Sequence, residues 1–147
     1  MLVTNHVLSG AVIGAVVRRP AAAFALGVAS HFALDAAPHW GKFSARTYLR
    51  VAVPDGLTGL VVMGAMTALA PRGRRAAVLA GMVGAALPDL DKPSRLFFGR
   101  SPFPPAVDRF HVRIQQHEAS GRAHYEATAA VLFGSVAVAL LRGRHPD

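Results

Sequence analysis

The stretch Ser30-His31-Phe32-Ala33-Leu34-Asp35-Ala36-Ala37-Pro38-His39-Trp40 ends an apolar run that begins at residue 21. His31 and Asp35 are four residues apart, a spacing that places two side chains on one face of a helix, about one turn apart. Pro38 predicts that the helix ends just before it, with His39 beyond the end and able to turn back. Imidazole and carboxylate groups bind zinc and similar divalent ions. Such polar groups are costly among apolar neighbours, which favours a functional role for them.

The composition predicts residence in a membrane. The chain has 147 residues, 52% hydrophobic and 16% charged, with a mean hydropathy of +0.35. This balance is more apolar than that of ordinary soluble domains, and the length fits one domain. The absence of cysteine excludes disulfides and thiolate metal ligands. The net charge of +8 fits an anionic membrane surface; we expect no nucleic-acid partner, because no basic groove interleaved with aromatic residues accompanies the charge.

Five apolar segments follow one another along the chain, at residues 2–17, 21–37, 53–70, 76–90 and 124–141. Each has about 15 to 18 residues, slightly fewer than the ~20 that cross a bilayer core, and local thinning of the bilayer accommodates such lengths. We therefore predict an all-α, integral membrane bundle of about five short helices in a single domain, residues 1–147. Residues 1–6 carry no Lys or Arg, and the basic pair Arg18-Arg19 follows the apolar run, which is the reverse of the order in a signal peptide; we therefore expect this segment to stay as a membrane helix and not to be cleaved.

Small residues recur in three of these segments. Glycines at such positions let helix backbones approach closely in lipid. The sequence therefore predicts close packing at Gly10, Gly14, Gly56, Gly59, Gly64, Gly81 and Gly84.

The connection at residues 91–123 should contain a surface helix. Its first half is rich in proline and is predicted to be irregular. In its second half Val107, Phe110 and Ile114 recur at helical spacing. This pattern predicts an amphipathic helix over residues 106–118 that lies at the membrane surface, with Arg109 and Arg113 on its polar side.

The acidic residues and the histidines are distributed unevenly between the two ends of the predicted bundle. If all five segments cross, the basic turns at residues 18–20 and 71–75 share one side with the basic tail. The N-terminus and the connections at residues 38–52 and 91–123 share the other side, with every acidic residue except Asp147 and every histidine except His145. The positive-inside rule mildly favours this His/Asp end on the outer side of a cytoplasmic-type membrane.

Several other segments could add metal ligands to the pair formed by His31 and Asp35. Leu87-Pro88-Asp89-Leu90-Asp91 ends the fourth segment with two carboxylates, and the surface helix adds two histidines. The predicted ligand set is His31, Asp35, His39, Asp89, Asp91, His111 and His117. We expect one or two divalent ions, zinc first, with manganese or iron as alternatives. His6, His124 and Glu126 are weaker candidates.

Each candidate also has a structural interpretation. His31 with Asp35 could be a buried, hydrogen-bonded pair that holds helices together. Asp55 could cap a helix that begins at Pro54-Asp55-Gly56, where the helix dipole favours a carboxylate. Asp91 could form an ion pair with Lys92 or Arg95. The two histidines of the surface helix, His111 and His117, could be ordinary exposed residues.

Three motifs resemble the family of small predicted membrane-bound metal-dependent hydrolases: Asn5-His6 before a small-residue helix, His31-x3-Asp35-x2-Pro38-His39, and Leu87-Pro88-Asp89-Leu90-Asp91. The second motif is also similar to metal-ligand segments of zinc-dependent phospholipase C and related nucleases. The resemblance implies an all-helical fold and a divalent-metal hydrolase of phosphoester-type substrates. Many members of the family carry a His after the Pro-Asp-x-Asp segment, where this chain has Lys92.

We therefore expect a membrane-bound metal-dependent hydrolase that acts on a phosphoester or lipid-type substrate at the membrane surface. The metal would activate water and polarise a phosphoryl oxygen, and Asp55 or Glu118 would accept the water proton. Arg109 and Arg113 would receive the phosphate of an anionic phospholipid head group. One alternative is a non-catalytic membrane protein whose His/Asp cluster is a structural metal or hydrogen-bond site. Another is a soluble helical domain.

Overall fold

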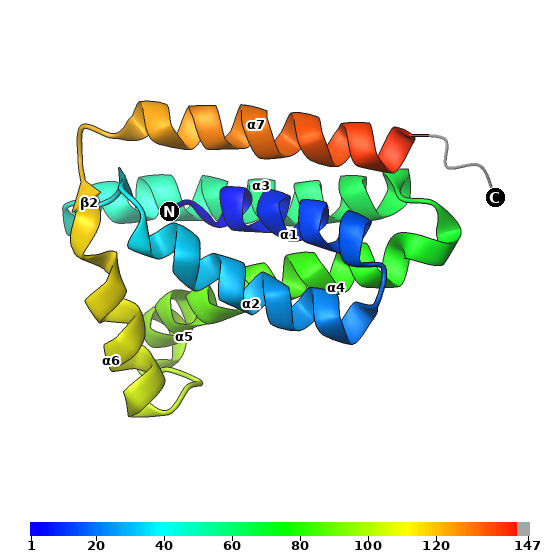
Figure 1. The fold of residues 1–147 in the computed structure, drawn as a ribbon. Coiled ribbons are helices and arrows are strands. Elements are labelled where there is room, and N and C mark those ends of the chain that lie inside the picture. The colour runs from blue at the N-terminus through cyan, green and yellow to red at the C-terminus, as the bar shows by residue number, and fades with distance from the viewer. Residues whose placement is uncertain (144–147) are drawn as a thin grey trace.

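The computed structural model describes residues 1–143, apart from the side chains of residues 45 and 46. The fold is all-helical, as predicted, except for one short pair of strands (Figure 1). In chain order the elements are α1 (Val3–Val17), α2 (Pro20–Ala36), β1 (His39–Trp40), α3 (Ala45–Leu69), η1 (Arg72–Arg74), α4 (Arg75–Ala86), η2 (Leu87–Leu90), α5 (Asp91–Phe98), α6 (Pro105–Ile114), η3 (Gln115–His117), β2 (Glu118–Ala119) and α7 (Ala123–Arg142).

Helix α1 lies at the centre of the bundle and packs against α2, α3, α4 and α7. In Figure 1 α7 runs across the top, and α2 and α4 lie below α1. The core consists of small and medium apolar side chains, which let these helices lie close together. Its buried members are Val7, Ala11, Ala15, Ala70, Val78, Met82, Ala137 and Leu141.

Glycines bring the backbones of α1, α2 and α4 into direct contact, as predicted for the glycines of α1 and α4; the glycine of α2 was not in the prediction. A Cβ atom on Gly10 would overlap the backbone of Gly81 and Met82, and one on Gly27 would overlap Gly81 and Ala85. Helices this close fix the relative position of the residues that they carry. The packing prediction is wrong for two glycines of α3, where an added Cβ would meet nothing within 4 Å: Gly56 and Gly64.

The second segment ends where proline predicts. Helix α2 stops at Ala36, and Ala37 is extended (φ −77°, ψ 159°), as the residue before a proline prefers. The third segment differs from the prediction, because α3 begins well before Pro54. Ser44 caps it by accepting a hydrogen bond from the Thr47 amide (3.3 Å), and Pro54 lies inside the helix. The predicted helix start at Pro54-Asp55-Gly56 is therefore wrong.

Asp55 caps a helix other than its own. Its carboxylate accepts hydrogen bonds from the backbone amides of Val3 (2.7 Å) and Thr4 (3.1 Å), at the first turn of α1. Thr4 Oγ1 donates to the Asp55 carbonyl (3.1 Å). A carboxylate at this position satisfies donors that the helix itself leaves unpaired and interacts favourably with its dipole. Asp55 thus joins α3 to the start of α1.

The fourth segment is shorter than predicted, and it is followed by a helix that the sequence did not indicate. Helix α4 ends at Ala86, and the 3-10 turn η2 leads directly into α5. The prediction of an irregular first half of residues 91–123 is wrong over α5. Pro93 lies in the first turn of that helix, where a proline removes no intrahelical hydrogen bond. Gly99, with φ 70°, ends α5 in the left-handed conformation.

The predicted surface helix is present but ends earlier, at Ile114, and the chain continues through η3 into β2. Strand β2 pairs in parallel with β1, with His39 opposite Glu118 and Trp40 opposite Ala119. Two-residue strands carry no readable alternation, so the sequence did not indicate this pairing. It joins the chain beyond α2 to the chain just before α7 and holds α6 and η3 against α2.

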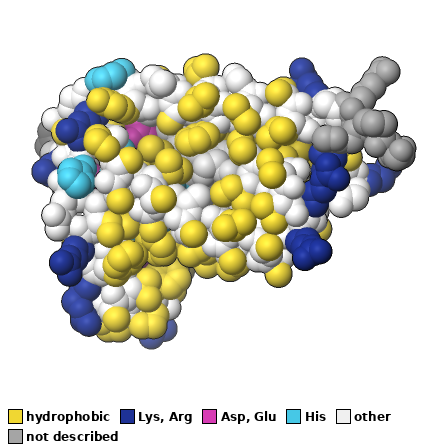
Figure 2. Space-filling model, in the orientation of Figure 1, with side chains coloured by type: hydrophobic (Ala, Val, Ile, Leu, Met, Phe, Trp, Pro, Cys, Tyr) yellow, Lys and Arg dark blue, Asp and Glu magenta, His cyan; other side chains and the backbone are white. Residues whose placement is uncertain are grey.

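Two helices are long and apolar enough to cross a membrane: α3 over Thr47–Leu69 and α7 over Ala123–Arg142. In the most apolar stretch of α3 only 6% is buried in the bundle, and in that of α7 only 17%. Figure 2 shows hydrophobic side chains across the middle of one face and Lys and Arg toward its ends. Helices α1 and α2 are apolar but shorter. The crossing of a membrane by all five segments stays a prediction.

Candidate metal centre

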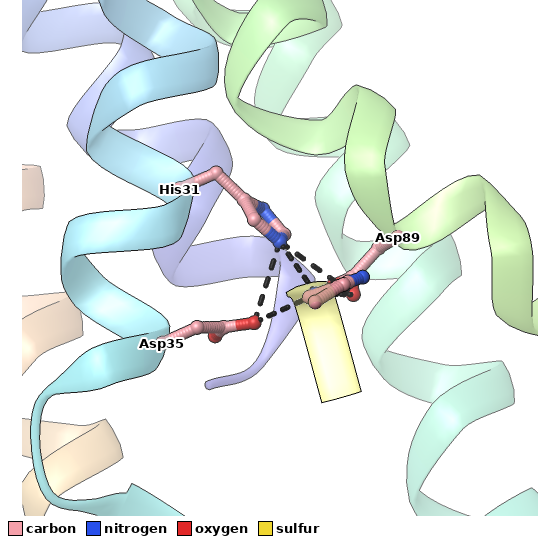
Figure 3. A group of neighbouring side chains, drawn as sticks. His31, Asp35 and Asp89 are labelled. Carbon is pink, nitrogen blue, oxygen red and sulfur yellow. Dashed lines mark hydrogen bonds and ion pairs between the residues drawn. The ribbon is translucent and has the colours of Figure 1, made fainter. Parts of the chain in front are cut away.

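His31 and Asp35 lie on one face of α2, as their spacing predicts. Both side chains are fully buried, and His31 Nε2 is 3.3 Å from Asp35 Oδ2. Figure 3 shows both side chains directed toward Asp89, which faces them from η2. The close packing of α2 on α4 sets this approach, because η2 follows α4 directly.

His111 completes the group from α6. Its Nε2 lies 3.1 Å from His31 Nε2, 3.0 Å from Asp35 Oδ2 and 3.8 Å from Asp89 Oδ1. One ligand atom from each of these four residues lies within 4.8 Å of the others. We call His31, Asp35, Asp89 and His111 the four-residue group. All four were in the predicted ligand set, and the chain brings them together from three separate elements.

The Nδ1 atoms of His31 and His111 each face an oxygen atom. His31 Nδ1 is 2.8 Å from the Ala85 carbonyl, which can only accept, so His31 Nδ1 carries the proton. His111 Nδ1 is 3.5 Å from Asp91 Oδ2. Metal-ligating histidines are oriented in this way, with Nδ1 donating outward and Nε2 directed at the metal. Asp91, predicted as a ligand, here supports His111, and it does not pair with Lys92 or Arg95.

Lys92 carries the positive charge next to the group. Its Nζ donates to Asp89 Oδ1 at 2.5 Å, and its side chain is 32% exposed. Burial opposes ionisation of Asp89, but the charge of Lys92 outweighs it and lowers the pKa of Asp89 to about 2. Burial likewise disfavours the ammonium, and Asp89 holds the pKa of Lys92 above its usual range. Asp89 is therefore ionised at neutral pH.

His111 holds a proton more tightly than an ordinary histidine. Burial alone would lower its pKa, but hydrogen bonds to Asp35 and Asp91 outweigh this and raise the pKa to about 9. A positive His111 explains how two Nε2 atoms can lie 3.1 Å apart: one of them donates to the other. A divalent cation between them would replace this proton.

Three neighbours complete the surroundings of Asp35. Gln115 Nε2 donates to Asp35 Oδ2 at 2.7 Å, and His6 Nε2 lies 3.1 Å from Asp35 Oδ1. The Met1 amino group also donates to Asp35 Oδ1 (2.8 Å). His6 is fully buried and stacks on His31, with ring centroids 4.0 Å apart. His6 was only a weak candidate. Gln115 was not a candidate, although the helical spacing of Gln115 from His111 could have indicated it.

His39 and Glu118 form a separate pair at the β1–β2 pairing. His39 Nε2 is 3.3 Å from Glu118 Oε1, and this hydrogen bond, against a smaller effect of burial, lowers the pKa of Glu118. Beside them the buried Glu126 accepts from the Leu2 and Trp40 amides and from Asn5 Nδ2, at distances of 3.0, 3.1 and 2.7 Å. Three donors satisfy this carboxylate, which joins α7, α1 and β1.

The other predicted site residues lie away from the four-residue group. His117 is exposed and its Nδ1 donates to the Ala36 carbonyl (3.2 Å), while Arg109 is exposed on α6. The carboxylates of Asp55 and Glu118 already accept the hydrogen bonds described above. A shallow hollow of about 330 Å³ beside α6 is lined by Ala36, Phe110, Arg113, Ile114, Gln116 and His117.

The donor set fits a divalent metal ion. It offers two imidazole nitrogens and two carboxylates, which suit zinc, manganese or iron. Both histidines present Nε2 inward while Nδ1 is held by an oxygen atom, and the carboxylates supply the negative charge that a cation requires. A search of protein-family models, of curated proteins and of solved structures found no match for this chain, so its geometry carries the functional argument.

Proposed function

We propose that the protein is a membrane-bound metal-dependent hydrolase that acts on a phosphoester or lipid-type substrate at the membrane surface. One observation carries the proposal: two buried histidines and two carboxylates direct one ligand atom each at a common point. A bound divalent ion supplies Lewis acidity toward water and toward a phosphoryl oxygen. The resemblance to small membrane-bound metal-dependent hydrolases supports this choice; its motifs include His31, Asp35 and Asp89 but not His111.

The location in a membrane is supported by the outward faces of α3 and α7. Their exposed side chains include Leu60 (65% exposed), Val61 (70%) and Val131 (70%). A soluble protein rarely leaves so many large apolar side chains in water on adjacent helices. We propose that the bundle is integral to a cytoplasmic-type membrane, with the His/Asp end on the outer side.

The residues around the four-residue group have distinct roles in this proposal. Asp91 and the Ala85 carbonyl hold the two imidazoles so that their Nε2 atoms face inward. Gln115 fixes Asp35. Lys92, which is partly exposed beside Asp89, offers a cation to an anionic substrate oxygen. Farther from the group, Arg113 lines the hollow beside α6 and would bind the phosphate together with Arg109.

Zinc is the ion we propose first, with manganese or iron as alternatives. The test is elemental analysis of detergent-purified protein beside the double variant His31→Ala/Asp35→Ala, with the exposed His124→Ala as a matched control. We expect one or two equivalents of metal in the wild type and in the control, and none in the double variant. No metal in any sample after loading with divalent ions would overturn the proposal.

A structural, non-catalytic site is the second candidate. The observation in its favour is burial: His31 and Asp35 are fully buried and His111 is 2% exposed. A structural site is saturated by protein ligands, whereas a catalytic site keeps an open position. Cobalt-substituted protein separates the two, because added phosphate changes the visible spectrum only where a position is open. An unchanged spectrum, with metal bound, would favour the structural site.

A further inference from the structure

The α5–α6 hairpin, residues 91–114, exposes an apolar surface that no other part of the described chain covers. Phe97 is 72% exposed, Phe98 77% and Val112 67%, with Leu96 and Phe110 about half exposed. In Figure 1 the hairpin projects from the bundle, and in Figure 2 hydrophobic side chains cover much of this projection. A group of large apolar side chains of this extent marks an interaction surface.

The charges exposed on the hairpin are positive. Its two carboxylates are both occupied: Asp91 faces His111, and Asp108 accepts from Arg95 (2.7 Å) and Ser101 (2.8 Å). Figure 2 shows Lys and Arg along the outer edge of the projection. This surface therefore combines apolar side chains with the exposed cations Arg100, Arg109 and Arg113.

The hairpin also lies at the level where the two candidate membrane helices begin. Strand β1 precedes α3 and strand β2 precedes α7, and the two strands pair with each other. Helix α6 reaches β2 through a single 3-10 turn, and in Figure 1 it runs across the long direction of the bundle. A helix placed in this way, apolar on one side and basic on the other, is suited to the plane of the lipid head groups.

We propose that the α5–α6 hairpin is a docking surface for the head-group layer of an anionic membrane leaflet. Phe97 and Phe98 enter the upper acyl region, and Arg109 and Arg113 meet lipid phosphates. The apolar face of such helices lies about 5–10 Å into the boundary between head groups and acyl chains. Because α6 carries His111, the docked hairpin holds the candidate metal centre among lipid head groups. The inference rests on the membrane location proposed above, but not on metal binding or hydrolysis.

The absence of cysteine allows a direct test. Single variants Phe97→Cys, Val61→Cys and Ser120→Cys are labelled with a nitroxide and reconstituted into phosphatidylcholine nanodiscs with and without phosphatidylglycerol. Val61 is an exposed position in the middle of α3, and Ser120 lies in the exposed turn before α7. Spin-label relaxation then gives the ratio of accessibility to oxygen, which enters lipid, over accessibility to a water-soluble nickel chelate.

We expect the ratio at residue 97 to be several-fold higher than at residue 120 and lower than at residue 61. A label at residue 97 as accessible to nickel as the one at residue 120 would overturn the inference. A label at residue 97 shielded from both probes would mean a protein partner or a second copy of the chain, and would overturn it too. If the label at residue 61 is also exposed to nickel, the membrane location itself is wrong and both proposals fail.

A second comparison tests whether docking depends on the arginines of α6. Arg109→Gln/Arg113→Gln in the Phe97→Cys background should make the label shallower in nanodiscs that contain phosphatidylglycerol. The matched double variant Arg19→Gln/Arg72→Gln removes two exposed arginines from the opposite end of the bundle and should leave the depth unchanged. An equal effect of the two double variants, or no effect of either, would overturn the preference for anionic lipid.

Discussion

The Nε2 atoms of His31 and His111 face each other at 3.1 Å, although the two residues are far apart in the sequence. Helix α2 carries the first and α6 the second, and Asp35 contacts both imidazoles. Two neutral imidazoles with Nδ1 protonated would repel each other in this arrangement. A shared proton or a bound cation removes this repulsion.

Asp91→Asn should weaken metal binding without removing a ligand. The variant replaces the carboxylate that holds His111 Nδ1, and loss of such a supporting group costs about 10–100-fold in metal affinity. Competition with a chromogenic chelator measures the change. Asp108→Asn, on the same hairpin but paired with Arg95, is the control and should bind metal as the wild type does.

Metal affinity should rise with pH. His111, with its pKa raised to about 9, holds a proton in the metal-free protein at neutral pH, and metal binding must release it. Below pH 9 the affinity should therefore increase by up to about tenfold per pH unit, and acidification should release the ion. Calorimetry in two buffers of different ionisation enthalpy counts the released protons. Binding without proton release would contradict the protonated state of His111.

Gly81→Ala should destabilise the bundle strongly, because an added Cβ would overlap the Gly10 backbone. Overpacking of this kind costs about 1–3 kcal/mol, and more where the backbone cannot move. Thermal unfolding in detergent, followed by circular dichroism, measures the loss. Gly64→Ala is the matched control: nothing lies within 4 Å of its Cβ position, so it should be neutral or stabilising.

Asp55→Ala tests whether this carboxylate holds the fold or takes part in a reaction. As the cap of α1 it should contribute about 1 kcal/mol to the free energy of unfolding. The expected result is a lower unfolding temperature with an unchanged metal content. An unchanged unfolding temperature, combined with loss of a metal-dependent activity, would instead support the predicted role as proton acceptor.

The local pattern of α2 and α6 was readable from the sequence, whereas α5 was missed and the start of α3 was misplaced. The spacing of His31 and Asp35 predicts one helical face, and Pro38 predicts the end of α2; both predictions are confirmed. Apolar periodicity likewise predicts α6. These features depend on local geometry, which the order of residues specifies directly.

The features that depend on contacts between distant segments could not be predicted from the sequence. Asp55 looked like the start of its own helix, because a Pro-Asp-Gly sequence is a good helix beginning. Only the packed structure shows that α3 starts upstream and that Asp55 reaches α1. His39 and Glu118 meet through two-residue strands that carry no periodic signal. His6 is an ordinary histidine near the chain start until α1 packs against α2 and stacks it on His31.

The four-residue group draws its members from α2, η2 and α6, which meet only in the folded chain. No short peptide from this sequence holds all four residues, so metal affinity and folding are thermodynamically linked. An ion present at 100 times its dissociation constant would add about 2.7 kcal/mol to the free energy of unfolding. A strong chelator should then accelerate proteolysis of the α5–α6 hairpin, since the ion would fasten α6 to the rest of the bundle.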